Sequence, residues 1–196
     1  ENSEGEYANL GGFVHLDNDY ATSIQTALFT KQGCLRIIKY AFEYAKQRGN
    51  GSKVTSITKS NAQAYGMVMW DNCFKEVSKD YPDIKTESLL VDAACMDLVR
   101  RPEMFDVIVA SNLFGDILSD LGAGITGGMG VAPSSNINPD LTVPSMFEPV
   151  HGSAPDITGQ GIANPLASIL SAAMMSDYLD YKEINNLIRK SVQQSI

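Results

Sequence analysis

The first part of the chain shows two different hydrophobic periods. Short apolar runs at 11–16 and 21–29, joined by a polar Asp-Asn-Asp turn, predict two paired strands. Thr30 can cap a helix, and the helical period that follows it extends to Arg48. The apolar stripe of this predicted helix comprises Leu35, Ile38, Phe42 and Ala45. The glycine-rich segment 49–52 is expected to end the helix.

Strands and helices alternate through the rest of the chain. The predicted elements are strands at 53–58, about 86–91 and 105–110, and helices at about 64–78, 165–179 and 182–191. The continuous apolar run at 105–110 is typical of a strand buried on both faces of a mostly parallel sheet. The alternation as a whole favours an α/β fold.

The segment 122–145 is rich in Gly and Pro and is predicted to be a long loop. It opens with Gly122-Ala-Gly124-Ile-Thr-Gly127, which matches the dinucleotide-binding fingerprint G-x-G-x-x-G. That fingerprint must follow a strand and open a helix, whereas this copy follows a predicted helix. We therefore interpret these glycines as a helix stop and the start of a flexible loop.

Composition limits the functional class. The 196 residues are 44% hydrophobic and 19% charged, as in soluble α/β proteins of one or two domains. The formal net charge of −8, with scattered Lys and Arg, argues against nucleic-acid binding. No apolar run reaches the ~18 residues of a membrane-spanning helix. Three cysteines without C-x-x-C spacing favour a reducing compartment, which is the cytoplasm or the mitochondrial matrix.

Two acids, Asp116 and Asp120, lie four residues apart on the helix predicted after the buried strand. This spacing places both carboxylates on one helix face, where they repel each other. A divalent cation that prefers oxygen ligands would relieve the repulsion, although a solvated acidic face is the more common outcome. Asp92, which follows the apolar residues 89–91, is a candidate third ligand.

Two further residues are candidates for proton transfer. Lys59 directly follows the predicted strand 53–58, and its default interpretation is a surface lysine. Beside carboxylates and a metal ion, it would instead be placed to accept a proton. Tyr7 lies in a glutamate-rich segment and is unremarkable alone, but in a metal site it could deliver a proton.

A loop of small residues runs from His151 to Asp156. Small residues let backbone N–H groups approach a ligand closely. Asp156 could then bind the two vicinal hydroxyls of a ribose, and it would repel a 2′-phosphate.

Five separated motifs link these candidates. They are Glu1-Asn-Ser-Glu-Gly-Glu-Tyr7, Thr58-Lys-Ser-Asn61, Val91-Asp92-Ala93, Ser111-Asn-Leu-Phe-Gly-Asp-Ile-Leu-Ser-Asp120, and Glu148-Pro-Val-His-Gly-Ser-Ala-Pro-Asp156 running on to Asn164-Pro165. In content and order they resemble the β-decarboxylating dehydrogenases, the family of isocitrate, 3-isopropylmalate and tartrate or D-malate dehydrogenases. The resemblance extends from residue 1 to about residue 179. Segments 132–139 and 144–149 look like the tartrate/D-malate branch.

The resemblance implies a role for each candidate residue. Tyr7 would protonate the enolate after decarboxylation, and Lys59 with Asp92 would take the proton of the substrate hydroxyl. The ligands of Mg²⁺ or Mn²⁺ would be Asp92, Asp116 and Asp120. The NAD site would comprise Glu148, His151, Gly152, Ser153, Ala154, Asp156 and Asn164. Family members that use NADP carry a lysine and a tyrosine at the position of Asp156, so Asp156 points to NAD.

The resemblance also implies an isopropylmalate-dehydrogenase-like open sheet with helices on both faces, which is not a Rossmann fold. Residues 1–104 would form the smaller dimerisation and catalytic domain, and residues 105–196 the later half of the larger, NAD-binding domain. Lys59 and Asp92 would reach into the site of a partner copy, so the active site of the homodimer would be shared.

These features predict metal- and NAD-dependent oxidative decarboxylation of a small 2-hydroxy diacid. A 3-isopropylmalate or isocitrate dehydrogenase, a non-catalytic subunit of such an enzyme, and a lyase acting on a hydroxy acid remain alternatives. The five arginines do not form the family's substrate clamp; they are Arg36, Arg48, Arg100, Arg101 and Arg189. Together with a polar opening that lacks an initiator Met, this indicates a fragment without the N-terminal part of the fold. We expect it to be inactive and marginally stable by itself.

Overall fold

A computed structural model describes residues 2–49 and 51–195. Two compact units can be separated, Glu1–Ser119 and Asp120–Ile196, and each is described by itself. These units reflect contacts within one chain. The division into functional domains at residues 104 and 105 therefore stays a prediction.

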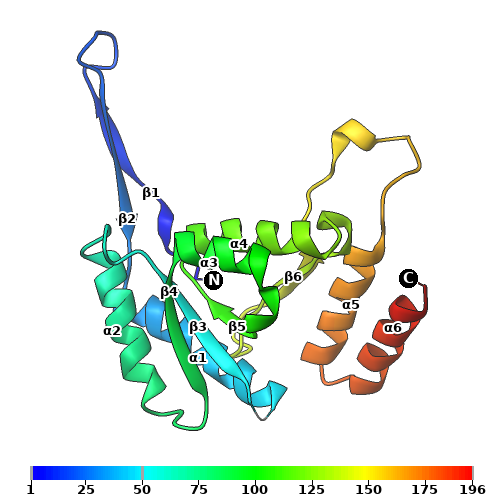
Figure 1. Ribbon diagram of the computed structural model, residues 1–196. Helices are drawn as coiled ribbons and strands as arrows, with labels where there is room; N and C mark the ends of the chain where they lie inside the picture. Colours follow the sequence, from blue (N-terminus) through cyan, green and yellow to red (C-terminus); the bar gives the residue numbers. More distant parts are fainter. Residues whose placement is uncertain (1, 50, 196) are drawn as a thin grey trace. The chain divides into compact units, whose positions relative to one another are not determined.

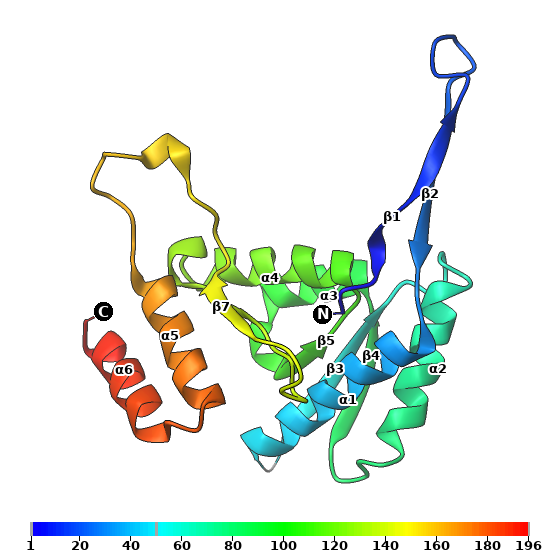
Figure 2. The same cartoon turned by 180° about the vertical axis from the view of Figure 1, so that it is seen from behind.

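The first unit is built on a three-stranded parallel sheet with the strand order β4-β3-β5. The strands are β3 (Lys53–Thr58), β4 (Lys85–Leu90) and β5 (Val107–Val109). Helices α1 (Lys31–Arg48) and α2 (Gly66–Ser78) cover one face of this sheet and α3 (Val91–Arg100) covers the other (Figures 1 and 2). The central strand β3 is rich in β-branched residues, and its last five residues are buried. The predicted α/β fold with helices on both faces is confirmed.

Helix α1 matches its predicted bounds because its local signals agree. The Thr30 hydroxyl accepts a hydrogen bond from the Gly33 N–H at 3.0 Å and caps the first turn. Ile38, Phe42 and Ala45 of the predicted stripe are fully buried, whereas Leu35 is half-buried. The predicted stripe is thus the face that packs on α2 and the sheet.

The predicted pair of strands at the start of the chain is a long antiparallel hairpin. It consists of β1 (Gly5–Val14), which begins earlier than predicted, and β2 (Thr22–Leu28). The hairpin projects away from the sheet of its unit, and most of its residues are exposed (Figure 1).

The apolar run predicted as a strand at 105–110 forms a shorter strand. β5 has three residues and lies at the edge of the three-stranded sheet in the described part of the chain. The carboxylate of Asp106, directly before β5, accepts hydrogen bonds from the Arg48 side chain at 2.7 Å and the Lys53 N–H at 3.2 Å. These bonds hold Asp106 outside the strand pairing.

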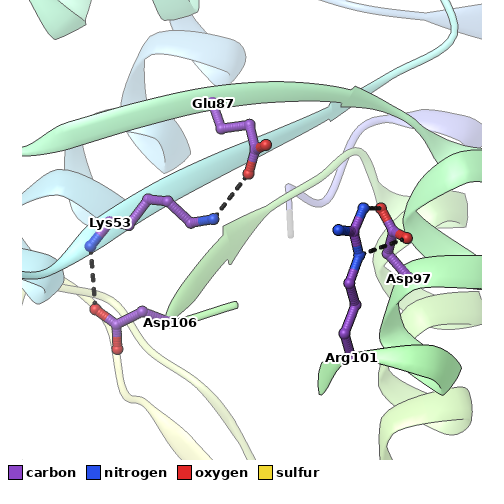
Figure 3. A network of polar contacts seen from close by, with 5 residues as sticks. All are labelled: Lys53, Glu87, Asp97, Arg101 and Asp106. Atoms are coloured by element: carbon purple, nitrogen blue, oxygen red, sulfur yellow. Dashed lines mark hydrogen bonds and ion pairs between the residues drawn. The ribbon is translucent and has the colours of Figure 1, made fainter. Parts of the chain in front are cut away.

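Polar contacts reinforce the sheet and α3 (Figure 3). Lys53 also donates from Nζ to Glu87 at 2.8 Å, which joins β3 to β4. On α3, Asp97 is 5% exposed and accepts two bonds from Arg101 at 3.0 and 3.1 Å. This bidentate contact holds the pKa of the Asp97 carboxyl below its ordinary value.

Helix α4 (Asn112–Thr126) contradicts the predicted helix stop at Gly122. Gly122 and Gly124 both lie inside the helix, where the Gly122 carbonyl accepts a hydrogen bond from the Thr126 hydroxyl at 2.9 Å. The helix stop is formed by Gly127 and Gly128, which have positive φ angles of 123° and 98°. The glycines do not follow a strand, which agrees with the rejection of the dinucleotide fingerprint.

In the second unit, part of the predicted loop 122–145 is ordered as a strand. β6 (Pro133–Asn136) pairs antiparallel with β7 (Met146–Pro149), and helix α5 (Leu166–Tyr178) packs on both. The Tyr178 hydroxyl donates to the Asn138 carbonyl at 3.0 Å and so fastens α5 to the segment between the strands. Helix α6 (Lys182–Ser195) lies beside α5 and extends beyond its predicted end. Among the described residues, we find no helix that is long and apolar enough to cross a membrane.

Candidate active site

Lys59 and Asp92 meet at the carboxyl ends of two neighbouring strands. Lys59 directly follows β3, Asp92 lies in the first turn of α3 directly after β4, and the two strands are parallel partners. The Lys59 ammonium donates to Asp92 Oδ1 at 2.6 Å. This bond, together with backbone N–H groups at the start of α3, lowers the pKa of the Asp92 carboxyl. The structure therefore pairs a potential base with an ionised acid.

The opening segment of the chain lies along the first turns of α4. The Tyr7 hydroxyl donates to Asp116 Oδ2 at 2.7 Å. One turn earlier on α4, the Asn112 N–H donates to Asn2 Oδ1 at 3.0 Å. Glu4 accepts from the Thr30 N–H at 2.8 Å and the Thr30 hydroxyl at 2.7 Å, which ties the same segment to the start of α1.

Asn2 and Glu4 are not among the site residues predicted from the sequence. Asn2 is 6% exposed and Glu4 is half-buried, yet neither takes part in a hydrophobic period. No spacing rule connects Asn2 with Asn112, because local patterns relate only residues that are close in the sequence. The buried environment of Asn2 became visible only in the structure.

Asp116 and Asp120 lie one turn apart on α4, as predicted, and both are exposed. No lysine or arginine of residues 2–49 or 51–195 forms an ion pair with either acid. Two carboxylates on one face without an ion-pair partner are suitable oxygen donors for a hard divalent cation. The donor chemistry of the pair therefore fits Mg²⁺ or Mn²⁺.

Among the described residues, Asp116 and Asp120 are not joined by a third acid. Mg²⁺ takes roughly six oxygen ligands, some of them water. In the part of the chain that the structure describes, no three His, Cys, Asp or Glu side chains come close enough to hold a metal ion. Asp92, the third predicted ligand, is instead paired with Lys59.

The predicted cofactor residues lie on one exposed connection of the second unit. Glu148 is exposed on β7. The loop that connects β7 to α5 projects beyond the start of α5 (Figure 2). Ala154 has a left-handed φ of 45° and leads into a short 3-10 turn, Pro155–Ile157. The Asp156 side chain is exposed, while the Asp156 carbonyl accepts from Gln160 Nε2 at 2.7 Å. Gly152 and Ser153 are also exposed.

Two residues at the edges of this loop have fixed side chains. His151 Nδ1 lies 2.8 Å from the Gly152 carbonyl, a contact that requires a protonated Nδ1. Asn164 Oδ1 accepts from the Leu166 N–H, the first of α5, at 3.0 Å and so forms a local turn before the helix. A Cβ atom at Gly130 would lie 2.9 Å from the Asn164 Cβ, so this glycine permits the close packing.

Comparison with known proteins decides the family. The sequence model of the isocitrate/isopropylmalate dehydrogenase family matches residues 1–196. The chain belongs to the isocitrate/isopropylmalate dehydrogenase family. The predicted resemblance is thereby confirmed.

The names of relatives with similar sequences agree with the predicted tartrate/D-malate branch, and a solved structure of another branch has the same fold. The D-malate dehydrogenase [decarboxylating] of Escherichia coli (strain K12) is 48% identical over 201 residues, covering 100% of this chain and 55% of that protein. A probable tartrate dehydrogenase/decarboxylase of Bacillus subtilis (strain 168) is 50% identical over 194 residues, covering 99% and 54%. The crystal structure of isocitrate dehydrogenase from Methylococcus capsulatus superposes with a TM-score of 0.91 at 42% identity, covering 99% and 56%. The chain thus spans about half the length of the curated relatives it matches.

Proposed function

We propose that this chain belongs to an enzyme that oxidatively decarboxylates a small 2-hydroxy diacid, with NAD and a divalent metal ion. The substrate class is that of the relatives named for D-malate and tartrate. The observation that carries the proposal is the 2.6 Å contact of Lys59 with Asp92 at the carboxyl ends of β3 and β4. Open α/β folds place their reacting groups at this edge of the sheet.

Two proton transfers are assigned to the chain's own residues. Lys59, oriented by Asp92, first releases its own proton to solvent and then, as the neutral amine, takes the proton of the substrate hydroxyl as hydride leaves the same carbon for NAD. Loss of CO₂ then leaves an enolate, and Tyr7 protonates its carbon. A positioned side chain of this kind accelerates a reaction by about 10²- to 10⁴-fold.

The metal ion would be held by Asp116 and Asp120, together with Asp92 of a second copy. When bound, it supplies Lewis-acid polarisation of the substrate oxygen. The support for this assignment is the donor chemistry of the acid pair, which no lysine or arginine of the described residues neutralises.

A homodimer with shared sites is part of the same proposal. The β1–β2 hairpin supports it, because a two-stranded hairpin is at best marginally stable without a partner surface. Large apolar side chains on this hairpin are exposed, among them Phe13 at 71%, Leu16 at 64% and Ile24 at 58%. An exposed apolar surface of this kind is typical of a protein interface.

The test is a turnover assay of the natural full-length protein with Mn²⁺, NAD and D-malate or tartrate, followed by absorbance of the reduced cofactor. We expect cofactor reduction that a chelator abolishes. Faster turnover of isocitrate or 3-isopropylmalate would move the substrate class within the family. Product formed without cofactor reduction would indicate a lyase, and no turnover of any 2-hydroxy diacid would contradict the proposal.

Cofactor choice gives a separate prediction. Asp156→Ala should lower the ratio of kcat/KM with NAD to kcat/KM with NADP by roughly tenfold, because it removes a charge that repels the 2′-phosphate. It should also weaken NAD binding, because one ribose hydrogen-bond partner is lost. The measurement is kcat/KM for both cofactors. Asp140→Ala, which removes another exposed loop acid, is the matched control and should leave the ratio unchanged.

A further inference from the structure

The hydrogen bond between Tyr7 and Asp116 joins two groups with different roles in the proposed function, on which this inference rests. Asp116 is one of the two acids assigned to the metal ion, and Tyr7 is the assigned proton donor. The Tyr7 hydroxyl lies 2.7 Å from Asp116 Oδ2, so it is bonded directly to a carboxylate that we assign to the metal ion. We propose that Tyr7 and the divalent cation compete for Asp116, so that metal binding releases the Tyr7 hydroxyl from this carboxylate.

The competition has an electrostatic cause. An O–H group that donates to a carboxylate directs its positive end at the oxygen, and a cation bound there meets that positive charge. The cation also draws electron density from the carboxylate, which makes the oxygen a poorer acceptor. The coupling is reciprocal. The factor by which the Tyr7 hydrogen bond lowers the affinity for the metal ion is the factor by which the bound metal ion lowers the equilibrium constant for forming that hydrogen bond.

The surrounding contacts confine the change to the side chain of Tyr7. The segment before it is fixed at two points, by Asn2 on α4 and by Glu4 on Thr30. Tyr7 itself is 55% exposed, which leaves space for rotation about its side-chain bonds. The backbone can therefore stay in place while the hydroxyl changes partner.

The consequence concerns the order of events. With Asp116 occupied by the cation, the Tyr7 hydroxyl no longer donates to this carboxylate, and its proton can pass to the enolate instead. With the metal absent, that donor is engaged by Asp116. Readiness for the final proton transfer is thereby linked to metal binding.

The decisive experiment compares Mn²⁺ binding by the wild-type protein and by Tyr7→Phe, measured by titration calorimetry at neutral pH. The variant keeps the ring and loses only the hydroxyl. Competition predicts that Tyr7→Phe binds Mn²⁺ about two- to tenfold more tightly, which corresponds to one removed hydrogen bond. Tyr20→Phe is the matched control: this tyrosine lies in the turn of the same hairpin, is 79% exposed, and should leave the affinity unchanged.

A second readout follows the tyrosine itself. Addition of Mn²⁺ to the wild-type protein should give a tyrosine ultraviolet difference spectrum that Tyr7→Phe lacks and Tyr20→Phe retains. Equal or weaker Mn²⁺ binding by Tyr7→Phe would overturn the competition and leave the proposed function in place. Absence of Mn²⁺ binding by the wild-type protein would overturn both.

Discussion

Lys59→Met is expected to lower kcat by about 10²- to 10⁴-fold, the range for loss of a positioned general base. The methionine side chain is about as long as the methylene stem of lysine, but it lacks the ammonium group. Lys59 contacts Asp92 at 2.6 Å, so the variant loses both the proton acceptor and the charge that orients Asp92. Steady-state turnover with saturating Mn²⁺ and NAD measures the effect.

A loss of folding stability cannot explain such a fall in kcat. The side chains of Lys59 and Asp92 are 27% and 66% exposed, and ion pairs that water reaches contribute little to the free energy of unfolding. We therefore expect Lys59→Met to unfold at nearly the same denaturant concentration as the wild type. A large shift would assign Lys59 a structural role instead.

The same strand supplies the matched control. Lys53 lies at the other end of β3 and pairs with Glu87 on β4 at 2.8 Å, as Lys59 pairs with Asp92 beyond β4. Lys53→Met removes a comparable ion pair far along the strand from the proposed base, and kcat should be unchanged. Equal losses in the two variants would contradict the assignment of Lys59.

Lys59→Arg separates charge from proton transfer. Arginine can keep the ion pair with Asp92, but its guanidinium does not release a proton at neutral pH. We expect this variant to be almost as impaired in kcat as Lys59→Met. Recovery of kcat by arginine would show that positive charge alone is required.

How far the sequence predicts this fold depends on whether the deciding interactions are local. Helix α1 was predicted correctly because its cap, Thr30, and its apolar stripe are all within the helix itself. Helix α3 was not predicted. It begins directly at the end of β4, and its cap position, Leu90, makes no side-chain capping bond. The apolar residues 89–91 therefore gave no indication that the strand ends there.

The candidate site divides in the same way. Asp116 and Asp120 were predicted to share a helix face, because a spacing of four residues is a local property. The place of Lys59 near Asp92 follows from parallel strands, whose carboxyl ends meet at one edge. The contact of Tyr7 with Asp116 spans 109 positions, and no pattern in the sequence predicts it.

Phe42→Ala is expected to destabilise the protein by about 3–5 kcal/mol, the cost of emptying a fully buried aromatic site. Phe42 has no exposed surface, and its ring lies 5.6 Å from that of Phe74 on α2 and 4.9 Å from that of Tyr81. The cavity would thus open between the two helices that cover one face of the sheet. Urea unfolding followed by circular dichroism measures the change in the free energy of unfolding.

The control for this core prediction lies two residues further along the same helix. Tyr44 is 44% exposed, so Tyr44→Ala leaves no internal cavity and should cost below about 1 kcal/mol. Phe42→Ala should affect the stability of the protein and not the rate of the reaction. Phe42 lies on α1, the helix that packs on β3, and does not belong to the proposed site, so Phe42→Ala should lower the amount of folded protein while kcat per folded molecule stays unchanged. A fall in kcat at low temperature, where the variant is still folded, would mean that the α1–α2 core also positions Lys59 at the end of that strand.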